Sequence, residues 1–80
     1  MENQPVPQAL TEAEYNEMKC HVLFPDSVEE IEKDTQWNQG MVDAISRYDP
    51  TRRRFEKIVE SNKRILHLKR RFNEFGAEKI

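Results

Sequence analysis

The feature that most constrains the fold is the stretch from Arg52 to Phe75, because no proline or glycine interrupts it. Pro50 precedes it at a position typical of a first helical residue, and Gly76 follows it as a common C-terminal cap. The stretch predicts one helix over residues 50–75, which at 1.5 Å per residue is about 39 Å long. Such a helix needs other elements to cover its apolar side, so we expect an all-α chain.

Two shorter helices are predicted before it, and each is marked at its start by a capping box. Thr11 with Glu14 begins the first helix, over about residues 11–23. Ser27 with Glu30 begins the second, which follows a proline and runs over residues 27–47. The predicted fold is therefore a small three-helix bundle or a helical hairpin with a long C-terminal helix.

The second helix contains a glycine, Gly40, which costs about 1 kcal/mol relative to alanine in a helix interior. We interpret the pattern as one helix with a weak centre, although Gly40 could also divide it. Its apolar side is formed by Val28, Ile31, Val42 and Ile45, with Trp37, Met41, Ala44 and Tyr48 beside them.

Residues 1–9 contain two prolines at alternate positions and are predicted to be a flexible N-terminal arm. Residues 10–80 then form a single helical domain. In the whole chain 36% of residues are hydrophobic and 35% are charged, against about 45–50% and 25% in ordinary globular chains. The core is therefore limited, and a partner or self-association would add stability.

The predicted core-facing stripe of the long helix contains two polar residues, Asn62 and Lys69. The spacing alternates between three and four residues, as it does in coiled coils, where a buried asparagine can fix the register of self-association. Alternatively, Asn62 pairs with a polar side chain of the second helix, and Lys69 extends its ammonium group to water. The stripe consists of Phe55, Ile58, Val59, Asn62, Ile65, Leu66, Lys69 and Phe72.

Leu68 and Phe75 lie outside this stripe but adjoin it, so the apolar surface widens toward the C-terminus. We expect a patch of Ile65, Leu68, Phe72 and Phe75 to contact another chain. The alternative is that the first helix or the N-terminal arm covers this patch within the chain. An exposed patch would make the protein a non-enzymatic protein–protein interaction module, such as an adaptor, an assembly factor or a small inhibitor or regulator.

Charge divides the chain into an acidic part and a basic part. Residues 1–46 carry a net charge of −8 (2 − 10), and residues 47–80 carry +6 (11 − 5). The acidic segment 26–43 either packs against the basic helix or binds a basic surface on a partner. A basic row opposite the apolar stripe offers an alternative function, a nucleic-acid-binding regulator. This row comprises Arg53, Lys57, Arg64 and Arg71, with glutamates placed between them as in a solvated helix face.

The sequence offers little catalytic or metal chemistry. Cys20 and His21 are adjacent, so on a helix their side chains point about 100° apart and do not form a nucleophile–base pair. One cysteine and two histidines do not match a zinc pattern, and two glycines do not make a phosphate-binding loop. We expect no enzyme activity, metal or cofactor. The lack of a leader or of an apolar run of about 20 residues favours an intracellular, cytoplasmic protein without a membrane partner.

Overall fold

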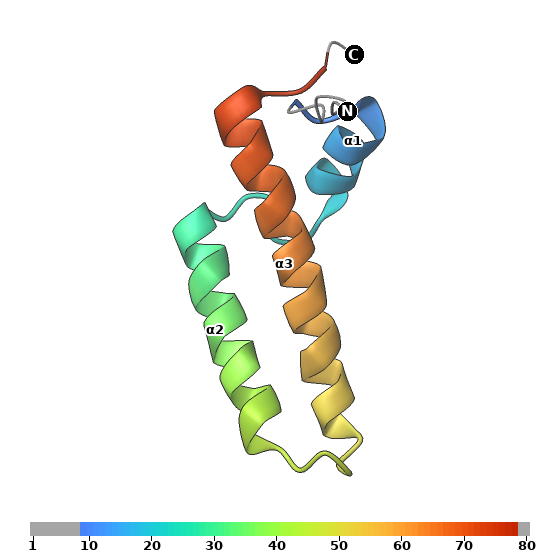
Figure 1. Ribbon diagram of the computed structural model, residues 1–80, viewed down its shortest axis with the longest axis vertical. Helices are drawn as coiled ribbons and strands as arrows, with labels where there is room; N and C mark the ends of the chain where they lie inside the picture. The colour runs from blue at the N-terminus through green and yellow to red at the C-terminus, as the bar shows by residue number, and fades with distance from the viewer. Residues whose placement is uncertain (1–8, 79–80) are drawn as a thin grey trace, which may run out of the picture.

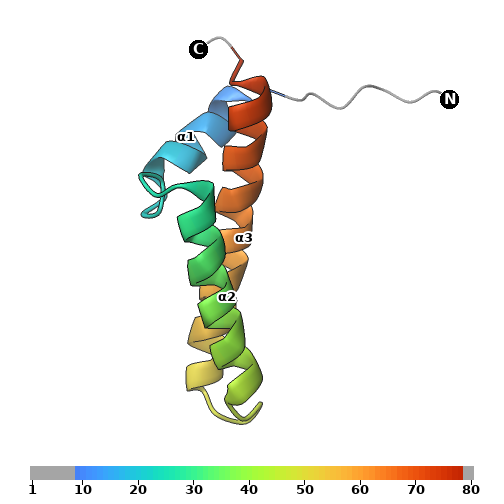
Figure 2. The ribbon, with the colours of Figure 1, turned by 90° about the vertical axis from the view of Figure 1, so that its left-hand side faces the viewer.

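A computed structural model describes residues 9–78, and over this range the chain is all-α. Helix α1 spans Glu12–Cys20, α2 spans Val28–Ala44 and α3 spans Thr51–Phe75. Helices α2 and α3 lie side by side as an antiparallel hairpin, and α1 packs beside the C-terminal half of α3 (Figures 1 and 2). The predicted all-α fold with a long C-terminal helix is confirmed. Residues 1–8, nearly all of the predicted N-terminal arm, lie outside the described residues.

Both predicted capping boxes are present. Thr11 Oγ1 accepts the N–H of Glu14 at 3.2 Å, and the Glu14 carboxylate accepts the N–H of Thr11 at 3.0 Å. Ser27 and Glu30 make the same two hydrogen bonds at 3.1 and 2.9 Å. Helix α2 continues through Gly40 without a break, which confirms the interpretation as one helix. These local sequence patterns therefore set where α1 and α2 begin.

The first two helices end earlier than the sequence predicts, at residue 20 rather than 23 and at residue 44 rather than 47. After α1, His21 is extended, and its ring Nδ1 accepts the backbone N–H of Leu23 at 3.0 Å. This bond takes the chain out of the helix, so Val22 is 84% exposed instead of lying on the helical face. Leu23 and Phe24 pack against the core in its place.

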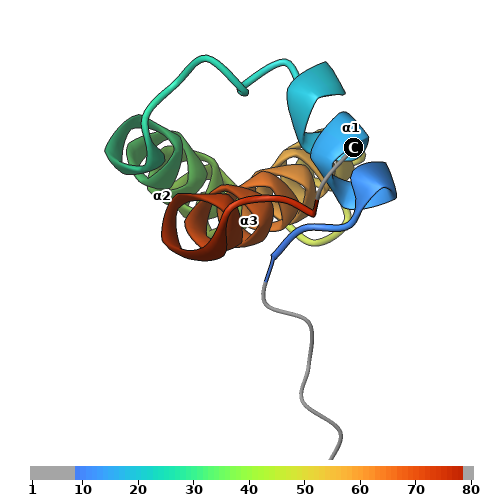
Figure 3. The same ribbon diagram turned by 90° about the horizontal axis from the view of Figure 1, so that it is seen from above.

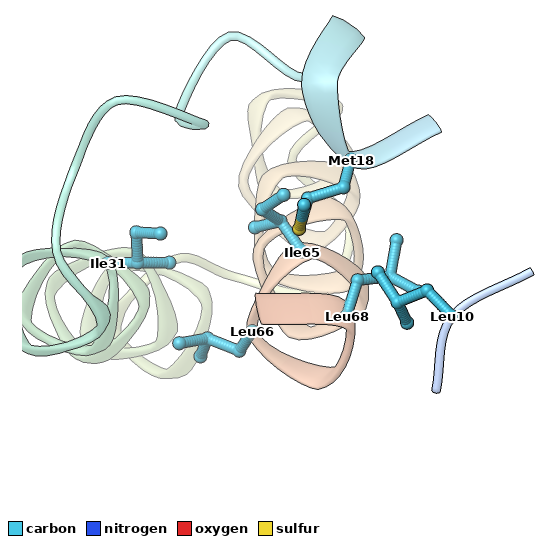
Figure 4. Close-up of a cluster of buried hydrophobic side chains, with 6 residues drawn as sticks. All are labelled: Leu10, Met18, Ile31, Ile65, Leu66 and Leu68. Carbon is cyan, nitrogen blue, oxygen red and sulfur yellow. The ribbon is translucent and has the colours of Figure 1, made fainter. Parts of the chain in front are cut away.

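The core lies at one end of the molecule, where α1, the start of α2 and the C-terminal half of α3 meet. Viewed from above, α1 and α2 lie on different sides of α3 (Figure 3). Met18 from α1 lies over Ile65, and Leu10 lies beside Leu68 (Figure 4). The full cluster of buried residues consists of Leu10, Met18, Ile31, Ile65, Leu66 and Leu68.

The segments flanking the helical region close this core. The backbone N–H of Leu10 donates to the carbonyl of Gly76 at 3.0 Å, and the N–H of Glu78 donates to the carbonyl of Leu10 at 2.7 Å. Gly76 has φ of +75°, a left-handed conformation that favours glycine. The resulting bridge between Leu10 and Ala77 holds the Leu10 side chain in the core. No helix among residues 9–78 has the length and apolarity needed to cross a bilayer.

Candidate protein-binding face

The predicted patch near the C-terminus of α3 is largely covered within the chain. Ile65 is fully buried and Leu68 is 1% exposed, both in the cluster with Leu10 and Met18. Phe72 packs against Tyr15 of α1, with 5.7 Å between ring centroids. Of the predicted patch, Phe75 remains 43% exposed. The expectation of an exposed four-residue patch is therefore corrected, because α1 and the segment before it cover this part of α3.

The buried Asn62 finds its partner within the chain. Its Nδ2 donates to the carboxylate of Asp34 on α2 at 2.8 Å. Asn38, also buried, donates to the backbone carbonyl of Asp34 at 2.7 Å and to its carboxylate at 3.2 Å. Within residues 9–78, no buried side-chain nitrogen or oxygen lacks a partner. The interpretation that Asn62 pairs with a polar residue of α2 is confirmed.

The ammonium group of Lys69 binds the loop between α1 and α2. Its Nζ donates to the backbone carbonyl of Phe24 at 2.7 Å and also to the carbonyl of Asp26. The ammonium group additionally lies 5.4 Å from the centroid of the Phe24 ring. The predicted extension to water is therefore corrected: Lys69 satisfies loop carbonyls and fixes the loop to α3.

The basic row is divided between internal ion pairs and exposed side chains. Arg64 binds Glu17 with two hydrogen bonds of 2.8 and 3.0 Å. Arg71 binds the Glu14 carboxylate at 2.9 Å. Among residues 9–78, neither Arg53 nor Lys57, the other two members of the row, makes an ion pair. The four residues therefore do not form one continuous row free for a phosphate backbone.

Electrostatic effects follow these contacts. The backbone N–H of Thr11 and the guanidinium of Arg71 hold the pKa of Glu14 below its ordinary value of 4.5. The hydrogen bonds from Arg64 lower the pKa of Glu17 and raise that of Arg64. In both glutamates the charged form is favoured, so the two ion pairs hold α1 on α3.

The acidic segment 26–43 packs in part against α3. Glu32 forms an ion pair with Arg70, and Asp34 accepts the hydrogen bond from Asn62 described above. Two of its acidic side chains thus join α2 to α3, which is the internal packing alternative for this segment.

The residue that caps the end of α1, His21, contacts Ser61 near the middle of α3. There the Nε2 of His21 lies 2.7 Å from Ser61 Oγ. Because His21 Nδ1 accepts a backbone N–H, a neutral ring carries its proton on Nε2 and donates it to the serine. The ring therefore has no free base nitrogen toward Ser61, and the pair fastens the end of α1 to α3.

Helix α1 lies beside the C-terminal half of α3, whereas α2 also runs along the N-terminal half (Figures 1 and 2). We call residues 51–60 the open half of α3. Trp37 of α2 is 61% exposed there and packs edge-on against Phe55, with 6.1 Å between ring centroids. Ile58 is 40% exposed. Trp37, Phe55 and Ile58 form the open face.

The sequence reasoning assigned these three residues to core-facing sides and so missed the open face. Two features of the sequence could have indicated it. The first predicted helix is much shorter than the long C-terminal helix, so it cannot cover the full length. A basic residue followed by an apolar one also recurs every seven residues at Lys57, Arg64 and Arg71, beyond the reach of one short helix. No protein family, curated protein or solved structure matches this chain.

Proposed function

We propose that the protein is a non-enzymatic protein–protein interaction module, acting as an adaptor, assembly factor or small inhibitor or regulator, and that it binds its partner through the open face. The observation that supports this proposal is the large exposed fraction of Trp37 beside Phe55 and Ile58. Tryptophan is among the residues most enriched at the centres of protein interfaces. In this molecule the three apolar side chains adjoin one another on the helical hairpin.

Burial of Trp37 against a partner would make a large contribution to the binding free energy. A tryptophan can bury roughly 150–250 Å², and at about 25 cal/mol per Å² the exposed part of Trp37 is worth about 2–4 kcal/mol. Folding of the isolated chain does not recover this energy. A partner that covers Trp37 and Ile58 would recover it, and each 1.4 kcal/mol corresponds to a tenfold change in affinity.

A site-specific photocrosslinking experiment tests the proposal. A photoreactive amino acid replaces Ile58 in one variant and the exposed His67, on another side of α3, in a matched control. In cells that produce the protein, we expect a covalent protein adduct from position 58 and none from position 67. The adduct mass then identifies either a different protein or a second copy of the chain. Equal adduct yields at both positions, or none at position 58, would contradict the proposal.

Nucleic-acid binding has less support, because Arg64 and Arg71 are engaged by glutamates of α1. Arg53 and Lys57 remain exposed and would have to supply the phosphate contacts. Binding of this kind weakens steeply with added salt, whereas binding through the apolar open face tolerates salt. A steep salt dependence that disappears in the Arg53→Glu, Lys57→Glu double variant would favour the nucleic-acid alternative.

A further inference from the structure

The docking surface that α3 offers to α1 is built from a repeated pair of residues. Each pair is a basic residue followed by an apolar one, and the pairs are spaced by seven residues, almost two helical turns. They are Lys57–Ile58, Arg64–Ile65 and Arg71–Phe72. The repeat therefore places three similar units along one flank of α3.

Helix α1 fills two of these units with complementary pairs of its own. In Glu14–Tyr15, the carboxylate binds Arg71 and the ring packs on Phe72. In Glu17–Met18, the carboxylate binds Arg64 and the methionine packs in the cluster with Ile65 (Figure 4). This flank of α3 therefore binds a helix in which an acidic residue is followed by an apolar one and the pair recurs three positions later.

The third unit is unfilled. Lys57 is exposed and makes no ion pair within residues 9–78, although Glu60 is a near neighbour on α3. Ile58 is 40% exposed and lies on the flank of Ile65. Arg54, one turn before Lys57, is also exposed and without an ion pair in the described part of the chain. Trp37 adds apolar surface to the same half of α3 through its contact with Phe55.

We infer that the open half of α3 binds an acidic amphipathic helix of a partner protein, in the manner in which the C-terminal half binds α1. An acidic residue of that helix pairs with Lys57, the apolar residue after it packs on Ile58, and a further apolar residue covers Trp37. The inference rests on the proposed function and adds the chemical class of the partner and the place of its contacts.

A partner protein fits this surface better than a second copy of the chain. The segment of this chain with the matching pattern is Glu14–Met18, which its own α3 already holds. Release of α1 to fill a second copy would expose Ile65 and Leu68 in the first. An acidic helix from another protein fills the open unit without that loss.

The test uses the full chain and a synthetic peptide of residues 11–21 with Cys20→Ser. The intramolecular α1 keeps its own two units occupied because of its high effective concentration. Trp37 is the one tryptophan of the chain, so its fluorescence reports on the open face. We expect a saturable blue shift on titration with the peptide. Lys57→Glu should weaken binding roughly fivefold to tenfold, since it replaces an ion pair with repulsion.

Two controls test whether the binding of the peptide depends on the charge of Lys57 in particular. Lys63→Glu changes an exposed lysine away from the open face and should leave the affinity within about twofold of the original. A peptide that also carries Glu14→Lys and Glu17→Lys should not bind the unchanged chain but should bind Lys57→Glu. Absence of a saturable shift, or equal losses in the two lysine variants, would overturn the inference. A Trp37 shift that depends on protein concentration alone would also overturn it, in favour of a second copy.

The outcomes separate this inference from the proposed function. A partner crosslinked at position 58, together with a peptide that does not bind, would leave the interaction module standing and reject the acidic helix as its ligand. Lack of a crosslinked partner at position 58 would reject the proposed function itself.

Discussion

The two halves of α3 carry similar side chains but differ in their surroundings. In the C-terminal half, Ile65 and Leu68 are buried by α1 and Leu10, and Arg64 and Arg71 are neutralised by glutamates. In the open half, an isoleucine and basic residues at equivalent spacing face solvent. The difference arises from the length of α1, which ends at residue 20, rather than from the composition of α3. The Lys57–Ile58 unit repeats the surface that α1 occupies elsewhere on α3, but nothing in the described chain covers it. We therefore expect a partner to bind there.

The largest expected effect is a difference in stability between matched truncations in the two halves. Leu68→Ala should lower the free energy of unfolding by about 2–5 kcal/mol, because it leaves a cavity in the buried cluster. Ile58→Ala should cost less than about 1 kcal/mol, because much of its side chain is already in water. Urea unfolding followed by circular dichroism measures both. Equal costs would mean that the open half is as well packed as the other half.

A smaller effect is expected on acidification. Glu14 and Glu17 have lower pKa values in the folded chain than in the unfolded chain, so the folded chain binds fewer protons. Their stabilisation is complete above about pH 4.5 and is lost as the pH falls through their folded pKa values. For these partly exposed pairs we expect a loss of about 1 kcal/mol. In the Glu14→Gln, Glu17→Gln variant this part of the pH dependence should vanish. Its persistence would show that it comes from other carboxylates, such as Glu30, whose pKa the hydrogen bonds of Ser27 also lower.

The smallest effect concerns α2 beside the open half. Gly40→Ala should raise the free energy of unfolding by about 0.5–1 kcal/mol, because alanine favours the helix and its Cβ would meet nothing within 4 Å. Gly76→Ala is the matched control and should be destabilising, because φ is +75° there. Thermal unfolding measures both changes. A Gly40→Ala variant that is less stable than the original would show that α2 is not a regular helix at this point.

Local patterns in the sequence predicted the helices well, whereas long-range contacts decided the binding face. Capping boxes placed the starts of α1 and α2, and Gly76 placed the end of α3, because these effects act over a few residues. Burial of Leu68 depends on Leu10, which lies far away in the chain and is held there by backbone pairing with Gly76. Helical periodicity contains no information on such pairing, so it could not tell a covered patch from an exposed one.

The pairing of Leu10 with Ala77 also has a consequence for the order of folding. Helices α2 and α3 are consecutive and joined by a short loop, so their contact closes little chain and forms early. Leu10 can pair only after the end of α3 is in place, so we expect α1 to dock last and to leave first on unfolding. A molecule that has released α1 exposes all three basic–apolar units in one line. The folded protein therefore leaves one unit open, whereas a form without docked α1 would leave all three open.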